Sequence, residues 1–269
     1  MTTPSPPPIL ALAAFAVMAA ATPAFAQAQT PAAVEGDDWD FGEDASRRLT
    51  IAAVTFENFG VAVRCMDGAF SLILSGLPEA SGERTIRYEI GDEEAESLWV
   101  SAPDSTSAFA VRPNWLAYHL SKGGHLALTV PDDQESRRIV ADLPPSPQAI
   151  ARVFSACGRA MPEDRSRLEI EEAIAMPGLT WRSMPRVEFP SATRAAAGIA
   201  SLTCNVKPDG SLRGCTAESE FPVGGGFGRA AVLGAHKTGR IGHSDRSRAP
   251  IADRQISFVV RYAMGPNAF

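Results

Sequence analysis

Four cysteines carry the clearest potential chemistry in this sequence: Cys65, Cys157, Cys204 and Cys215. In an oxidising compartment an even number of cysteines predicts disulfide bonds, and four cysteines allow three pairings. We favour Cys65–Cys157 with Cys204–Cys215, because this choice places one bridge in each half of the chain. No two cysteines have the C-x-x-C spacing, so neither a compact zinc site nor a dithiol redox site is expected.

Histidine and serine patterns argue against catalysis. The four histidines form neither H-x-x-x-H nor H-E-x-x-H: His119, His125, His236 and His243. The last two lie in a polar, glycine-rich stretch, which favours solvated loops over metal ligation. No G-x-S-x-G nucleophile motif is present. The sequence therefore predicts no catalytic residue and no metal site.

Glycine-rich and acidic segments also have simpler explanations than a cofactor. The run 224–228 lacks the G-x-G-x-x-G spacing and a following Lys-Ser/Thr, so we interpret it as a connection before a helix. The clusters at 37–38 and 92–94 lack the spaced ligands of a calcium loop and are expected to be solvated turns. No cofactor is predicted. We expect the tryptophans to be core or interface anchors: Trp39, Trp99, Trp115 and Trp181.

The N-terminus has the layout of a secretory signal peptide over residues 1–26. An apolar run at 9–21 precedes Ala24-Phe25-Ala26, so cleavage is expected after Ala26 and a periplasmic location follows. The n-region has no Lys or Arg, which leaves a retained membrane anchor as the alternative. As a helix the apolar run spans only ~20 Å, against a hydrocarbon core of ~30 Å. Residues 27–36 are expected to form a disordered leader.

Charge divides the remaining chain in two. Residues 27–181 carry 25 acidic and 13 basic side chains, whereas residues 182–269 carry 6 acidic and 12 basic ones. This asymmetry predicts two units with different surfaces. Nucleic acid is not an expected partner, because an exported protein does not normally meet it.

The first unit, residues 37–158, is expected to be β-rich with a C-terminal helix. Short β-branched or aromatic runs predict strands, separated by turn signals, and a brief helix is expected near 115–120. The strands are expected at 50–56, 59–65, 69–74, 84–90, 97–101, 108–112, 125–130 and 138–143. Ser146 and Pro147 open the closing helix as N-cap and first residue, and Cys157 lies on its buried face. Residues 159–180 are interpreted as a linker with a short helix near 168–175.

The second unit, residues 181–269, has a different pattern. Strands at 198–206 and 211–219 flank the turn Lys207-Pro-Asp-Gly210, which is a hairpin signal. A helix is expected from Phe227 and a final strand at 255–262. Together the two units predict an α+β fold.

The second unit resembles the C-terminal domain of the TonB family of energy transducers over about 80 of the 269 residues. The order and spacing of short motifs carry this resemblance, and no single motif is diagnostic. The matching stretches are Phe189-Pro190-Ser-Ala192, Gly198–Val206, Asp209-Gly210, Glu218-Ser219, Phe227-Gly228-Arg-Ala230-Ala231 and Ile256–Tyr262. Thr238-Gly239-Arg240-Ile241 replaces the Trp-x-Phe of the family, and a long Pro-rich spacer is absent.

The resemblance implies a periplasmic α+β module that binds a protein or peptide by strand addition. The expected binding surface is the last strand, with these partner-binding residues: Arg254, Gln255, Ser257, Val259 and Arg261. The basic balance of this half would attract an acidic segment, such as a short peptide of an outer-membrane receptor.

Three functions are therefore distinguished. The leading hypothesis is a non-enzymatic binding or adaptor protein of the cell envelope that is linked to transmembrane transport. The alternative is an inner-membrane-anchored transducer of the TonB type, which requires a retained N-terminus and would then contact the membrane. A cell-wall hydrolase lacks any catalytic constellation.

Overall fold

The computed structural model describes residues 39–103, 106–132, 135–162 and 167–264. The predicted signal peptide, leader and acidic pair 37–38 lie outside these residues. All of these described residues belong to one compact unit. Within the described part of the chain, no helix is both long and apolar enough to span a bilayer.

A nine-stranded antiparallel sheet dominates the first half, with strand order β1-β2-β3-β4-β7-β6-β5-β8-β9. Its strands are β1 (Asp40–Asp44), β2 (Leu49–Thr55), β3 (Gly60–Met66), β4 (Ala69–Ser75), β5 (Glu83–Ile90), β6 (Glu93–Ser101), β7 (Ala108–Ala110), β8 (Gly124–Asp132) and β9 (Glu135–Leu143). A short 3-10 turn, Ala45–Arg47, follows β1. Most strands lie within two residues of the predicted positions, because alternating burial and turn residues mark both ends.

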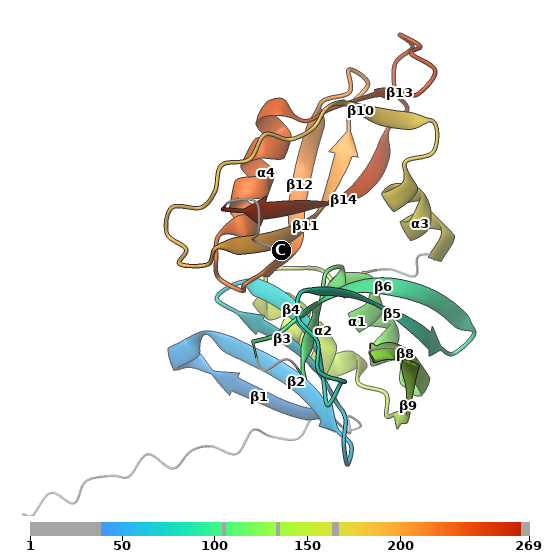
Figure 1. The fold of residues 1–269 in the computed structure, drawn as a ribbon, viewed down its shortest axis with the longest axis vertical. Coiled ribbons are helices and arrows are strands. Elements are labelled where there is room, and N and C mark those ends of the chain that lie inside the picture. The colour runs from blue at the N-terminus through green and yellow to red at the C-terminus, as the bar shows by residue number, and fades with distance from the viewer. Residues whose placement is uncertain (1–38, 104–105, 133–134, 163–166, 265–269) are drawn as a thin grey trace, which may run out of the picture. The chain divides into compact units, whose positions relative to one another are not determined.

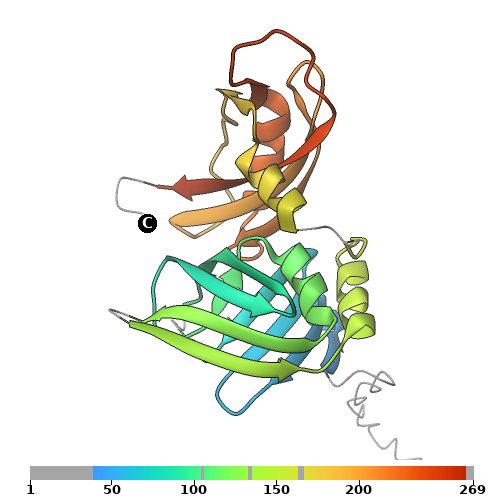
Figure 2. The ribbon, with the colours of Figure 1, turned by 90° about the vertical axis from the view of Figure 1, so that its right-hand side faces the viewer.

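Two helices cover one side of this sheet (Figures 1 and 2). They are α1 (Pro113–Ser121) and α2 (Pro147–Ala156), and they contact each other. Their apolar side chains share one core with the strands, in which Phe154 of α2 stacks on Phe70 of β4. Ser146 is the N-cap of α2 as predicted, but its hydroxyl makes no capping hydrogen bond. Pro147 at the first turn fixes the helix start instead.

A disulfide ties α2 to the sheet. Cys157 at the end of α2 is bonded to Cys65 in β3, 92 residues away along the chain. This is the bridge that we favoured from the sequence, and it confirms that the closing helix packs against the strand containing Cys65.

A second, three-stranded antiparallel sheet has the order β12-β11-β14. Its strands are β11 (Ala197–Val206), β12 (Leu212–Phe221) and β14 (Arg254–Ala263), and α4 (Phe227–Thr238) packs against β11 and β12 (Figure 1). Leu202, Cys204 and Val206 alternate onto the helix side and are fully buried. The predicted turn is formed: the Gly210 N–H donates to the Lys207 carbonyl.

Gly210 is required at this turn for two reasons. Its φ is +80°, a conformation that side-chain-bearing residues rarely adopt. A Cβ atom there would also lie 2.1 Å from the Ile241 carbonyl oxygen. The Ile241 N–H in turn donates to the Gly210 carbonyl, so the hairpin tip is fixed against the following strand.

The segment interpreted as a linker is more ordered than predicted. It contains α3 (Arg167–Ala175), where a helix was expected, and then β10 (Leu179–Ser183), which was not. β10 pairs with β13 (Arg240–His243). The short strands were missed because each has only four or five residues and their pairing spans about 60 residues of sequence.

The fold is therefore β-rich with a few helices. Two separate hydrophobic cores lie under the nine-stranded and the three-stranded sheets, and a small cluster of Val100, Val111 and Ile199 includes residues of both halves. The division into two domains stays a prediction.

Removal of the two disulfides should destabilise the protein to different extents. In the chain-entropy treatment, the Cys65–Cys157 bridge contributes about 4.5 kcal/mol and the Cys204–Cys215 bridge about 3 kcal/mol, because the first closes the longer loop. Urea unfolding of the Cys65→Ala/Cys157→Ala and Cys204→Ala/Cys215→Ala proteins measures the difference. Equal losses would show that loop length does not govern stability here.

Candidate functional site

The predicted binding strand, β14, lies at an edge of its sheet. It pairs with β11 on one side, and no described strand pairs with its other side. The Met264 N–H donates to the Ala196 carbonyl, and the register continues without a bulge to Val206↔Arg254. Because hydrogen-bonded and non-hydrogen-bonded pairs alternate, the even-numbered residues of β14 bond to β11. The odd-numbered residues, which include Val259 and Arg261, direct their main-chain groups outward.

Among these odd-numbered residues, the predicted binding residues Ser257, Val259 and Arg261 have side chains that are engaged within the chain. The Ser257 hydroxyl accepts a hydrogen bond from Arg112 Nε at 3.0 Å. Arg261 pairs with both carboxylate oxygens of Glu83 at 2.7 and 2.8 Å, and Val259 packs against the cluster of Val100, Val111 and Ile199. The main chain of β14, rather than its basic side chains, is thus what the strand offers to a partner.

The remaining two predicted residues lie at the beginning of β14. Arg254 donates to the Pro177 carbonyl, just before β10. Gln255 lines a cavity together with Ser257. The first half of the strand therefore borders a hollow, whereas Arg261 and Ala263 in the second half are exposed.

The cavity beside β14 has a volume of about 470 Å³. One wall is the face of the three-stranded sheet opposite α4, where Thr203, Thr216 and Ser257 present hydroxyl groups. The facing wall comes from β5, β6 and the start of α1. Residues 160–162 and α3 complete the lining. A cavity of this size with mostly apolar walls and a few convergent polar groups is typical of a ligand site.

Arg112, the residue before α1, brings positive charge into this cavity. Its Nε donates to Ser257, and its two terminal amino groups make no hydrogen bond to the residues that the structure describes. Burial lowers the pKa of Arg112 below its ordinary value, although the nearby Glu218 carboxylate opposes this shift. The guanidinium stays charged, because its ordinary pKa is far above neutral pH.

A second arginine, Arg159, contacts β12, which forms part of the cavity wall. Arg159, which follows α2, donates to the Ala217 and Glu218 carbonyls of β12 at 2.7 Å each and to Asn114 Oδ1 at 3.1 Å. One side chain thereby joins α1, the end of α2 and β12. Burial lowers the pKa of Arg159, and the Glu218 charge again opposes this.

Glu218 is the acid that influences both arginines. It lines the cavity and accepts a hydrogen bond from the Thr203 hydroxyl on the neighbouring strand. Glu96 also contributes to the lining, but it is exposed and pairs with Arg87 at 3.1 Å. The lining of the cavity therefore holds the Arg112 guanidinium with the Glu218 and Glu96 carboxylates, and Arg159 interacts with the Glu218 charge from outside the lining.

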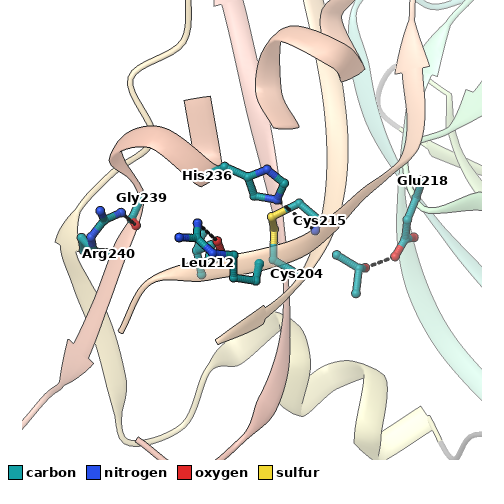
Figure 3. The surroundings of a disulfide bond; sticks show 9 residues. Cys204, Leu212, Cys215, Glu218, His236, Gly239 and Arg240 are labelled. Atoms are coloured by element: carbon teal, nitrogen blue, oxygen red, sulfur yellow. Dashed lines mark hydrogen bonds between the residues drawn. A yellow bond between two sulfur atoms is a disulfide. The ribbon is translucent and has the colours of Figure 1, made fainter. Parts of the chain in front are cut away.

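The second disulfide fixes the strands that carry this wall (Figure 3). Cys204 of β11 is bonded to Cys215 of β12, as we favoured from the sequence. The Cys215 N–H donates to Nε2 of His236, which points from α4 toward the bridge. His236 thus lies in a helix, and its predicted position in a solvated loop is wrong because the helical pattern continues through 227–238.

The other residues singled out for chemistry are scattered. His119 stacks on Trp115, His125 contacts Asp142, and His243 contacts the Ala249 carbonyl. In the described ranges no group of three or more His, Cys, Asp or Glu side chains could hold a metal ion. The glycine-rich run leads into α4, which begins at Phe227, as expected. Of the acidic cluster at 92–94 only Asp92 lies in a turn, and the prediction is wrong for Glu93 and Glu94, which begin β6. Trp39 and Trp99 are core residues, and Trp181 packs against Phe258.

The cavity was not predicted from the sequence. Trp115 packs against the first core, as expected of an anchor, and also lines the cavity, whereas neither Arg112 nor Arg159 was singled out. In the sequence, each arginine is distinguished only by its position next to the end of a predicted helix. That position does not indicate that both side chains contact the three-stranded sheet.

Comparison of the chain with protein-family models, with curated proteins and with solved structures finds no match. The resemblance to the TonB C-terminal domain therefore stays a prediction.

Replacement of Arg159 should cost substantial stability. The Arg159→Met protein loses three hydrogen bonds to partly buried acceptors, and we expect its free energy of unfolding to fall by about 2–4 kcal/mol. Arg47→Met is a matched control, because Arg47 is exposed and its ion pair with Asp44 is worth little. Urea unfolding of both variants measures the contrast, and equal effects would contradict the joining role of Arg159.

Proposed function

We propose that this chain is a non-enzymatic binding or adaptor protein of the bacterial envelope that takes an extended peptide along β14. The observation that carries the proposal is the edge of β14 with which no described strand pairs, and along which the odd-numbered residues direct their N–H and C=O groups away from β11. Such an edge accepts a further strand through main-chain hydrogen bonds.

The second half of β14 is the accessible part. α3 packs against β14 and shares the cavity lining with Gln255 and Ser257, so it lies beside the first half. Arg261 and Ala263 are exposed. A partner strand would begin pairing there, where its main chain meets fewer obstacles.

The architecture supports the likeness to the TonB C-terminal domain. β11, the turn at Gly210, β12, α4 and the terminal strand β14 follow in the order of that family. On this basis we interpret residues 181–269 as a small α+β module, preceded by the β-rich unit at 37–158. We also propose a periplasmic location and a role in envelope transport, which rest on the N-terminal pattern and on this resemblance.

The net charge of the second half of the chain supports an acidic peptide partner. The half of the chain that carries β14 has twice as many basic as acidic side chains, which favours the approach of an acidic segment. Because Arg261 is paired with Glu83, this attraction acts at long range rather than through a direct ion pair.

Amide hydrogen exchange tests the position of the partner strand. A bound peptide should slow exchange at Val259 and Arg261, whose N–H groups point outward. The Val260 and Tyr262 amides should exchange slowly with or without peptide, because they donate to β11. NMR of the purified protein, with and without a peptide selected by its retention on the immobilised protein, measures the exchange rates of all four amides. Protection that does not alternate along β14 would contradict strand addition.

A proline at an outward position should block the partner. Val259→Pro removes one outward N–H and places a ring in the path of the incoming strand, so we expect at least tenfold weaker peptide binding. Val259→Ala loses the same side-chain contacts and keeps the N–H, so its affinity should stay within about threefold.

Fluorescence polarisation with a labelled retained peptide compares the two variants. Equal affinities of the proline and alanine proteins would show that the β14 edge does not bind the peptide.

A further inference from the structure

The cavity at the beginning of β14 contains a cation, Arg112, that uses only part of its hydrogen-bonding capacity on the described residues. Arg112, the residue before α1, extends its side chain into the cavity. Its Nε donates a hydrogen bond to Ser257, and its two terminal amino groups are available to a ligand. A guanidinium in this state binds a carboxylate well, because its parallel N–H groups match the two carboxylate oxygens.

The charge around Arg112 also favours an anion. Arg159 directs its hydrogen bonds to neutral oxygens of Asn114, Ala217 and Glu218, although the Glu218 carboxylate still interacts with its charge. Glu96 is already paired with Arg87 at the edge of the site. This leaves Glu218 as the acid whose charge acts on Arg112, and the same carboxylate also acts on Arg159 outside the lining.

The rest of the lining suits an apolar group next to that anion. Trp115, Met161, Ile170 and Ile174 supply apolar surface, while Thr203 and Thr216 offer hydroxyls from the opposite wall. A ligand with a carboxylate attached directly to an apolar side chain would satisfy both kinds of wall.

The direction of β14 indicates which part of a peptide reaches the cavity. A strand that adds antiparallel to β14 begins beside Tyr262 and ends beside Gln255, because paired antiparallel strands run in opposite directions. Gln255 and Ser257 line the cavity, and Ser257 accepts the hydrogen bond from Arg112. The last residue of such a peptide would therefore arrive next to Arg112.

We propose that the cavity binds the free C-terminal carboxylate of a peptide whose last side chain is apolar, with Arg112 as the anchor. This inference rests on the proposed peptide binding along β14 and adds to it the chemistry of the peptide end.

Two pools of random heptapeptides, one with free C-terminal carboxylates and one amidated, test this on the immobilised protein. We expect at least tenfold greater retention of the free acids, with apolar last residues enriched, as read by mass spectrometry. Arg112→Met should weaken binding of a retained acid by about tenfold to a hundredfold and bring it to the level of its amide. Arg138→Met, which removes an exposed arginine paired with Glu89, should leave the preference unchanged.

The Glu218→Gln variant should change the affinity for the peptide acid in the direction opposite to Arg112→Met. It removes the negative charge beside Arg112 while retaining an oxygen for the Thr203 hydroxyl, so the acid should bind about threefold more tightly. This variant and the acid-against-amide comparison still decide the matter if Arg112→Met does not fold.

The outcomes separate the two proposals. Equal retention of both pools by the unaltered protein, with both lost in Val259→Pro, would overturn the carboxylate site and leave strand addition standing. A preference for acids that persists in folded Arg112→Met would also overturn it. Retention of neither pool would overturn both proposals.

Discussion

A guanidinium group withdrawn from water must find hydrogen-bond acceptors, and the contact between the two halves of this chain depends on that requirement. Arg159 meets it with two carbonyls of β12 and the side chain of Asn114 at the start of α1. Because these oxygens belong to elements far apart in sequence, one arginine fixes β12 against both helices of the first half. Arg112 meets the same requirement only in part, through Ser257.

The two faces of the three-stranded sheet have different roles: one closes a hydrophobic core, and the other lines the cavity. On the side of α4, Leu202, Cys204 and Val206 are fully buried and close the core. On the other side, the intervening residues place hydroxyl groups along the cavity. Because side chains alternate along a strand, a one-residue slip would exchange these faces. The hairpin turn at Gly210 and the bridge between β11 and β12 prevent such a slip.

Local patterns predicted much of this fold. Alternating apolar residues and Gly-containing turns located β3, β4, β8 and β11 closely, and the pairing of cysteines followed from assigning one bridge to each half. The short pair β10 and β13 could not be found in the same way, since each strand is stabilised by a distant partner. The edge position of β14 was anticipated from a resemblance, and its register required the structure. The cavity depends on side chains from seven elements, which no local sequence pattern brings together.

Both disulfides join cysteines that are consecutive in the sequence, Cys65 with Cys157 and Cys204 with Cys215. In a chain that enters an oxidising compartment from its N-terminus, Cys157 is the first thiol to follow Cys65, and Cys215 the first to follow Cys204. Oxidation of each new thiol with the one still waiting would therefore form both native bridges directly. In such a chain, the order of the cysteines favours formation of both native bridges without disulfide isomerisation.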